Sequence, residues 1–169
     1  MRRKQVKKVR AIIYDIKDNK PYFLILHRIL RWRGWEFLKE TIEKGETPKQ
    51  ALIRGIKEET KLKKFKIIKK LDKQEKWQAD GINYVIADSF LVKANMNDKI
   101  SLKQEIIEHD KYKWVDKKIA LKKLTWPKTK KLLKGMDPAT LFKGTRCRAK
   151  INGDRYKTWQ IQRIKSQKE

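Results

Sequence analysis

Residues 35–62 (WEFLKETIEKGETPKQALIRGIKEETKL) constrain this chain more than any other stretch, because helix start signals and many carboxylates occur there together. Thr47 suits a helix cap and Pro48 the first helical position, so we predict a helix that runs to about Lys61. Its apolar residues fall on one face, which predicts packing against a core. The stretch contains six glutamates: Glu36, Glu40, Glu43, Glu46, Glu58 and Glu59. Carboxylates gathered by a loop and a helix can hold Mg²⁺ that bridges two phosphates.

The spacing of this stretch resembles the Nudix box, whose pattern is glycine, five residues, glutamate, seven residues, and then Arg-Glu-apolar-x-Glu-Glu-x-Gly-apolar. Seven residues separate Glu46 from Arg54, and Glu58 and Glu59 follow in register. The residues before the box resemble those of the diadenosine tetraphosphate hydrolases and the RNA-decapping enzymes of this family. The resemblance covers about residues 6–134. It implies an α/β sandwich in which a mixed sheet lies between helices.

A Nudix hydrolase uses carboxylates of the box to bind Mg²⁺, which polarises phosphoryl oxygens and helps to generate hydroxide from water. The resemblance therefore implies catalytic roles for Glu58, Glu59 and Arg54. A further carboxylate of the family comes from a later loop. The segment EIIEHDKYKWV resembles that loop, and we prefer its Glu108 over Glu105. The metal ligands that the resemblance implies are Glu46, Glu58, Glu59 and Glu108.

Four positions depart from the Nudix pattern: Leu38 replaces a proline, Glu40 the box glycine, Gly55 the first glutamate of the Arg-Glu pair, and Lys61 the late glycine. Gly55 removes a carboxylate one turn before Glu58, so we expect Mg²⁺ to bind weakly or not at all. Glycine inside a helix also costs roughly 0.5–1 kcal/mol relative to alanine. Glu40 is expected to change the shape of the loop. We therefore predict that hydrolysis is slow or absent, and that Gly55→Glu raises metal affinity.

Further strands and helices are expected on both sides of this stretch. Apolar and β-branched runs predict strands, and helical spacing predicts two later helices. The strands are expected at residues 9–14, 22–26, 35–38, 65–71, 84–92 and 112–115, and the helices at 119–124 and 128–133. The turn segment IKDNKP predicts a hairpin between the first two strands. We assign residues 1–135 to a Nudix-like domain and residues 136–169 to a basic C-terminal extension.

Positive charge dominates the composition, since 46 Lys and Arg residues against 20 Asp and Glu residues give a net charge of +26. A domain this basic repels itself unless polyanions accompany it, so we expect RNA or a nucleoside polyphosphate as a partner. A lysine-rich proteome is the alternative explanation. Thermophile proteins, however, are enriched in lysine and glutamate together, and glutamate has not kept pace with lysine here.

The C-terminal extension is especially basic, with nine Lys or Arg residues against two acidic ones in residues 143–169. The pair Asn152 and Gly153 predicts a β-hairpin with arms at residues 147–151 and 155–161. This hairpin either packs on the domain or forms a nucleic-acid-binding arm with stacking rings, and the sequence leaves both open. Candidate nucleic-acid-binding residues lie near both ends of the chain: Arg2, Arg3, Lys4, Lys7, Lys8, Arg146, Arg148, Lys150, Arg155, Tyr156 and Trp159.

Cysteine and histidine are scarce. A single cysteine excludes an intrachain disulfide, and two distant histidines argue against a metal site built from histidine. The first apolar run, residues 11–14, is too short for a signal peptide or a membrane span. We therefore expect a soluble, cytoplasmic protein without a membrane partner.

Two functions account for most of these features. The first is a Nudix-fold RNA-binding protein, associated with the ribosome or another ribonucleoprotein, whose hydrolase activity is weak or lost. The alternative is a Mg²⁺-dependent Nudix pyrophosphohydrolase that acts on nucleoside polyphosphates or RNA 5′ ends. A chaperone-like or scaffold role is a third hypothesis. Gly55 favours the first function, whereas the retained glutamates of the box favour the second.

Overall fold

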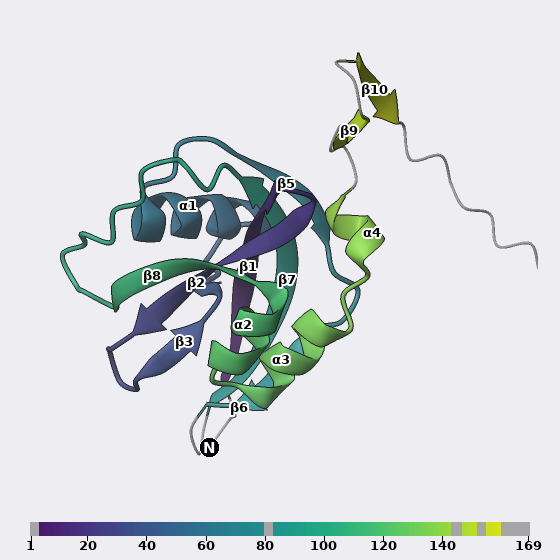
Figure 1. Cartoon of the computed structure of the whole chain (residues 1–169). Helices are drawn as coiled ribbons and strands as arrows, with labels where there is room; N and C mark the ends of the chain where they lie inside the picture. Colours follow the sequence, from purple (N-terminus) through teal and green to yellow (C-terminus); the bar gives the residue numbers. More distant parts are fainter. Residues whose placement is uncertain (1–3, 80–82, 143–146, 152–154, 160–169) are drawn as a thin grey trace, which may run out of the picture. The chain divides into compact units, whose positions relative to one another are not determined.

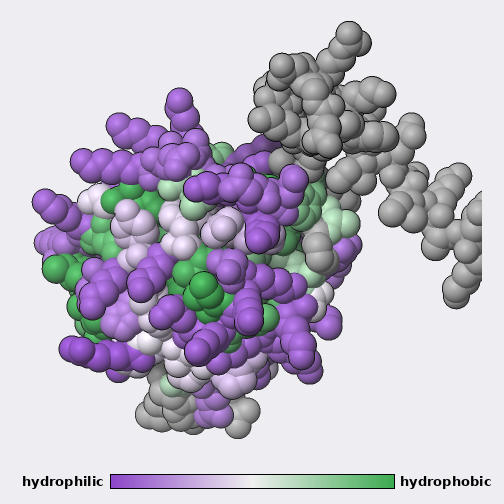
Figure 2. All heavy atoms as spheres, in the orientation of Figure 1, coloured by the Kyte–Doolittle hydropathy of each residue, from purple (hydrophilic) through white to green (hydrophobic). Residues whose placement is uncertain are grey.

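The computed structural model describes residues 4–79, 83–142, 147–151 and 155–159 (Figure 1). The chain divides into two compact units, residues 1–136 and residues 137–169. Hydrophilic side chains predominate on the face shown in Figure 2, and hydrophobic ones form small separate patches there. None of the described helices is long and apolar enough to cross a membrane.

An eight-stranded mixed sheet forms the centre of the first unit. Its strands are β1 (Lys4–Lys17), β2 (Lys20–Arg28), β3 (Gly34–Glu36), β4 (Leu38–Thr41), β5 (Phe65–Lys70), β6 (Glu75–Gln78), β7 (Asn83–Ala94) and β8 (His109–Asp116). The main path runs β3-β2-β1-β7-β5, while β4 pairs with β1, β6 with β7 and β8 with β2. β1 and β7 are parallel, and the other pairs are antiparallel. The long central strands β1 and β7 therefore hold the short ones in place.

β1 and β2 form the hairpin that the turn segment predicts. Lys17 pairs with Lys20, and Asp18 and Asn19 between them have φ values of 50° and 59°. Two successive positive φ angles are typical of tight turns that match the twist of a hairpin, and Asp and Asn tolerate them better than most residues. The predicted hairpin is confirmed.

Helix α1 (Pro48–Thr60) begins where the sequence predicts. The Thr47 hydroxyl accepts a hydrogen bond from the backbone nitrogen of Gln50 at 3.2 Å, and the Gln50 side chain accepts one from the backbone nitrogen of Thr47 at 2.9 Å. This reciprocal pair is a capping box, which fixes the start of the helix. The helix carries Glu58 and Glu59 in its last turn.

Helices cover both faces of the sheet. On β1, Ala11 and Ile13 join the core cluster beneath α1, whereas Ile12 between them is fully buried outside that cluster. Successive residues of a strand point to opposite faces, so the second face must be covered as well. Helices α2 (Lys117–Lys123) and α3 (Pro127–Lys134) lie on that side, away from α1 (Figure 1). The predicted α/β sandwich with a mixed sheet between helices is confirmed.

The second unit contains α4 (Pro138–Leu141) and the antiparallel pair β9 (Cys147–Ile151) and β10 (Arg155–Trp159). The predicted hairpin arms pair as expected over these residues, and residues 152–154 and 160–161 lie outside the described part. Several predicted RNA-binding positions also lie outside it: Arg2, Arg3 and Arg146 entirely, and the side chains of Lys4, Arg148, Lys150, Arg155, Tyr156 and Trp159. Their role in binding RNA stays a prediction.

Candidate functional site

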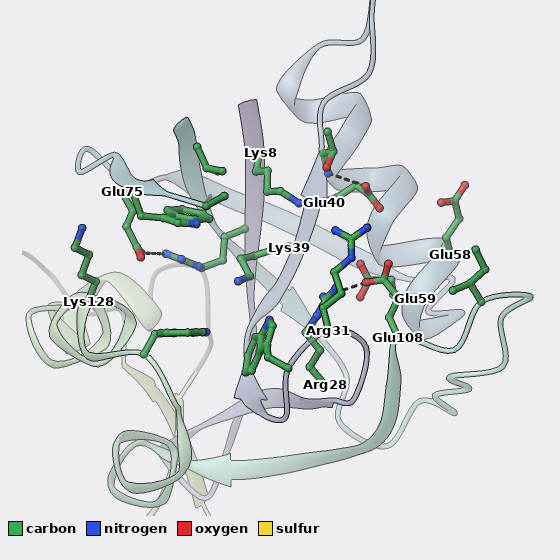
Figure 3. Close-up of a pocket in the computed structure, with 18 of the residues that line it drawn as sticks. Lys8, Arg28, Arg31, Lys39, Glu40, Glu58, Glu59, Glu75, Glu108 and Lys128 are labelled. Carbon is green, nitrogen blue, oxygen red and sulfur yellow. Dashed lines mark hydrogen bonds and ion pairs between the residues drawn. The ribbon is translucent and has the colours of Figure 1, made fainter. Parts of the chain in front are cut away.

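A pocket of about 1290 Å³ opens on the first unit (Figure 3). Its wall combines acidic, basic and aromatic side chains. At one end gather the carboxylates of Glu40, Glu58, Glu59 and Glu108. The basic wall residues include Lys8, Arg10, Arg28, Arg31, Lys39 and Lys128, and the tryptophans are Trp32, Trp77 and Trp126. The pocket therefore offers anions, cations and stacking surfaces to a single ligand.

The two neighbouring glutamates at the end of α1 have different environments. The side chain of Glu58 is 58% exposed, whereas that of Glu59 is 7% exposed. Oε2 of Glu59 lies 3.3 Å from Nδ1 of His109, but it accepts no hydrogen bond from the described residues. Burial raises the pKa of Glu59 to about 7, despite the opposing influence of His109. Glu59 is therefore a buried carboxylate that can take up a proton or a cation near neutral pH.

Glu36 and His109 form a buried ion cluster next to Glu59. The Glu36 carboxylate is contacted by His109 Nε2 at 3.2 Å, Arg28 Nη1 at 3.1 Å and Lys39 Nζ at 2.6 Å. Burial favours the neutral acid, but the hydrogen bond from His109 and the charges of Lys39 and Arg28 lower the pKa of Glu36 to about 2. Burial likewise disfavours the charged imidazole, but Glu36 and Glu59 raise the pKa of His109 to about 9. His109 is therefore a cation that bridges the two glutamates.

Arg54 ties the loop before α1 to the helix. Its Nε and Nη2 donate to the two carboxylate oxygens of Glu46, each at 2.9 Å, and Nη2 also donates to the Thr41 carbonyl at 2.9 Å. The hydrogen bonds from Arg54 lower the pKa of Glu46 to about 2. Such a two-pronged contact fixes both groups geometrically. We infer that the pair positions the loop.

The predicted site residues separate into two groups. Glu58, Glu59 and Glu108 line the pocket, whereas Glu46 and Arg54 are absent from its described wall. The pocket thus brings Glu58, Glu59 and Glu108 together, and the metal-binding and catalytic roles of all five residues stay predictions. Of the predicted RNA-binding residues, Lys8 lines the pocket and Lys7 is exposed. Burial, followed by repulsion from Lys39, lowers the pKa of Lys8.

Glu40 meets no special backbone angles in this structure, although the box glycine that it replaces allows them, and its expected effect on the loop stays a prediction. Glu40 lies in the extended strand β4 and pairs with Val9 of β1. Any residue adopts this backbone conformation, so the position does not require glycine. The departure that does meet unusual angles is Lys61, which ends α1 with a φ of 58°. Glycine is favoured at such a position because it has no Cβ.

Several residues of the pocket wall and of the ion cluster beside it could not be found from the sequence. His109 lies 73 positions from its partner Glu36, and no spacing rule connects them. Trp32, Trp77 and Trp126 come from three separate segments, namely a loop, β6 and the residue before α3. The one available signal was the position of Glu36 within the glutamate-rich stretch. The fold, rather than any local pattern, brings these residues together.

Comparisons with known proteins agree with this geometry. The family model of the NUDIX domain matches residues 4–136. The chain belongs to the Nudix family. It is similar to a C. elegans Ap4A hydrolase solved as a binary complex, with 27% identity over 76% of this chain and 93% of that chain and a TM-score of 0.67. The Nudix resemblance seen in the box is therefore confirmed. A comparison with curated proteins found no match.

Two more distant structures share the Nudix fold. One is an E. coli dihydroneopterin triphosphate pyrophosphohydrolase. It is 20% identical, the aligned region covers 76% of this chain and 92% of that chain, and the TM-score is 0.61. The NUDIX domain of Shewanella oneidensis NrtR, complexed with ADP ribose, is 14% identical, covers 78% and 85%, and has a TM-score of 0.59. At these identities the likeness establishes the fold alone.

Magnesium suits the oxygen donors of this Nudix pocket. Mg²⁺ binds one or two protein carboxylates together with substrate phosphates and several waters. Glu58 and Glu59 supply such oxygens, and Oε2 of Glu59 is a buried acceptor without a hydrogen-bond donor among the described residues. In the described part of the chain, no three acidic, histidine or cysteine residues enclose an ion by themselves. The residues therefore fit a metal that substrate phosphates help to hold.

Proposed function

We propose that this Nudix domain is a pyrophosphohydrolase that cleaves a nucleoside polyphosphate. The observation that carries the proposal is that one pocket combines carboxylates for a metal, cations for phosphates and tryptophans for a base. The similar C. elegans protein is an Ap4A hydrolase, which supports a substrate of the same chemical class. The weak or lost activity that we expected from Gly55 stays a separate prediction, and the proposal does not depend on it.

The base would bind among the tryptophans. Trp32 and Trp126 meet edge to face with ring centroids 5.1 Å apart, and Lys39 Nζ lies 5.7 Å from the Trp32 centroid and 5.6 Å from the Trp77 centroid. Tryptophan faces stack well on bases, and an adjacent ammonium group suits the phosphates that follow the base. Figure 3 shows Lys39 in the middle of the pocket and Glu59 farther toward its acidic end. A nucleotide bound this way extends its phosphates toward Glu59.

The acidic end supplies the groups that hydrolysis requires. Glu58 and Glu59 would hold Mg²⁺, which polarises phosphoryl oxygens and makes water more acidic. Burial raises the pKa of Glu59 to about 7, so without a bound cation this carboxylate takes up a proton near neutral pH. Arg28 and Arg31 lie in the wall nearby and neutralise negative charge on the phosphates. His109 keeps the Glu59 side chain in position.

A substrate screen tests this function. The full chain is incubated with Mg²⁺ and diadenosine tetraphosphate, a nucleoside triphosphate, ADP-ribose or RNA with a 5′ triphosphate, and the products are identified by mass. Cleavage between phosphates of at least one compound is expected, and ¹⁸O-water labels one of the two new phosphate ends. If none of these compounds is cleaved at any Mg²⁺ concentration, the domain is not a pyrophosphohydrolase of this class.

Trp126→Ala is expected to weaken substrate binding without unfolding the protein. Trp126 is 44% exposed, so its loss leaves the core intact. Loss of a stacked base costs roughly 1–3 kcal/mol, which corresponds to a rise in KM of about tenfold or more with little change in kcat. Tyr112→Ala is the matched control, because Tyr112 is 40% exposed and lies outside the described pocket wall. An unchanged KM for Trp126→Ala would remove the tryptophans from the binding site.

The net charge of +26 favours a second candidate function, which is RNA binding, including association with a ribonucleoprotein. Each phosphate that a lysine or arginine neutralises releases counterions, so affinity for RNA is expected to fall by about 10³-fold or more between 50 and 200 mM salt. Fluorescence anisotropy with labelled single-stranded RNA measures this. RNA with a 5′ triphosphate is compared with RNA that carries a 5′ hydroxyl. Equal affinity for the two RNAs would mean that RNA binds the surface of the protein rather than the pocket. A flat salt response would contradict the proposal.

A further inference from the structure

Gly55 and Glu40 contact each other in the structure, although they belong to different elements. A Cβ atom added to Gly55 would lie 2.8 Å from Cβ, 3.0 Å from Cγ and 3.3 Å from Oε2 of Glu40. Contacts under 3.0 Å essentially do not occur for real Cβ atoms. The clashing atoms are close to the backbone of Glu40, and β4 is hydrogen-bonded to β1 through the pair of Glu40 with Val9. The Glu40 side chain therefore fills the space that a side chain at position 55 would need.

The carboxylate of Glu40 reaches the acidic end of the pocket. Its side chain is 19% exposed, Oε1 accepts a hydrogen bond from the Thr41 nitrogen at 2.6 Å, and Oε2 lies 3.4 Å from Arg54 Nη1. The same Arg54 nitrogen lies 3.4 Å from Oε2 of Glu58, so one cation contacts both carboxylates. Figure 3 shows the carboxylates of Glu40, Glu58 and Glu59 at the same end of the pocket.

We propose that Glu40 supplies to the metal site the carboxylate that helix position 55 lacks, so that the glutamate has moved from α1 to β4. The two departures from the box pattern, glutamate at position 40 and glycine at position 55, are then one exchange rather than two losses. A second observation concerns Glu59: its buried Oε2 lines the pocket and accepts no hydrogen bond from the described residues, although His109 Nδ1 lies 3.3 Å away as an ion-pair partner. The inference rests on the proposed function, because it concerns the same Mg²⁺ site.

The exchange reverses an expectation from the sequence. We predicted that Gly55→Glu raises metal affinity, but the contact with Glu40 shows that the added side chain has no room. Overpacking of this kind is destabilising, and we expect Gly55→Glu alone to lower the unfolding temperature by about 5 °C. Metal affinity should fail to improve. Gly55→Glu is expected to be tolerated only together with Glu40→Gly.

Titration of the full chain with Mn²⁺ as a probe ion, by electron paramagnetic resonance, tests this assignment without reference to turnover. Glu40→Gln, which keeps the shape of the side chain, is expected to weaken Mn²⁺ binding by about tenfold or more. Glu40→Gly should weaken it similarly, and the double variant Glu40→Gly, Gly55→Glu should regain affinity to within about threefold of the wild type. This non-additivity marks two side chains that share one place. Glu43→Gln is the matched control, because Glu43 is 70% exposed and lies outside the described pocket wall.

The outcomes separate the inference from the proposed function. If Glu40→Gln binds Mn²⁺ as tightly as the wild type while Glu59→Gln loses binding, Glu40 is only a space-filling residue and the inference is overturned, whereas the hydrolase proposal survives. If the wild-type chain binds no Mn²⁺ either alone or with a nucleoside polyphosphate present, both are overturned. A double variant that folds, by its unfolding temperature, but binds no better than Glu40→Gly also contradicts the exchange.

Discussion

Replacing Glu59 with glutamine is expected to lower kcat/KM for a nucleoside polyphosphate by about 10³-fold. Glu59 is the most buried carboxylate of the pocket wall, and Oε2 lacks a hydrogen-bond donor among the described residues. An amide of the same size can neither accept a proton from water nor bind Mg²⁺ through an anionic oxygen. Because the shape is kept and a buried charge is removed, the unfolding temperature should not fall. A wild-type rate for Glu59→Gln would show that this carboxylate takes no part in the chemistry.

The pH profile of the same reaction identifies the group. The pKa of Glu59 is raised to about 7, so the side chain is protonated below that pH and ionised above it. If the ionised form is required, kcat/KM rises about tenfold per pH unit below the midpoint of this titration and levels off above it. Bound Mg²⁺ competes with the proton, so the midpoint lies below pH 7 when Mg²⁺ is present. The Glu59→Gln variant should retain a low rate without this step.

Glu36→Gln is expected to lower the free energy of unfolding by about 3–5 kcal/mol, because it removes the single anion that three cations contact in a buried site. His109, Arg28 and Lys39 all lie within 3.2 Å of the Glu36 carboxylate, which is 3% exposed. Urea unfolding at pH 7 measures the loss. Glu108→Gln serves as the control, because Glu108 also pairs with Arg28 but is 35% exposed. That variant should lose no more than about 1 kcal/mol.

Acid unfolding provides a second measure of the Glu36 cluster. The cluster lowers the pKa of Glu36 from 4.5 to about 2, so the native protein holds the ionised form more strongly than the unfolded chain does. This stabilisation is present above pH 4.5 and is lost as the pH falls through about 2. Glu36→Gln should lack this part of the acid sensitivity. If Glu36→Gln and Glu108→Gln lowered the free energy of unfolding equally at pH 7, burial would not determine how strongly an ion pair with Arg28 stabilises the protein.

The parts of the fold that follow from short-range chemistry were predictable. The hairpin at Asp18 and Asn19 and the start of α1 at Thr47 depend on residues within a few positions of each other. The position of Glu58 and Glu59 was predictable too, because both fall within the helix that begins after Thr47. Local backbone preferences and helical periodicity are enough for such features. The fold class followed from the resemblance of residues 35–62 to the Nudix box.

The contacts that decide the character of the site are long-range. His109 reaches Glu36 and Glu59 only because β8 folds back beside β2. Glu40 and Gly55 looked like two separate losses, since the sequence does not show that β4 packs against α1 at this point. The side chain of Glu40 from β4 fills space beside Gly55 of α1, and a sequence pattern within one strand or one helix cannot reveal such a contact. The sequence therefore suggested two separate losses, whereas in the structure the Glu40 side chain occupies the space beside Gly55.

Turnover of diadenosine tetraphosphate by the full chain, with Mg²⁺ and with excess chelator, is the most direct test of pyrophosphohydrolase activity. A rate on the order of 1 per second or faster is expected with Mg²⁺, which is within the usual range of enzymes, and none is expected with chelator. The rate with Glu59→Gln sets the background. A wild-type rate no higher than that background with diadenosine tetraphosphate and with every other compound of the substrate screen, at any Mg²⁺ concentration and with folding verified, would contradict the assignment of this pocket as a hydrolase site.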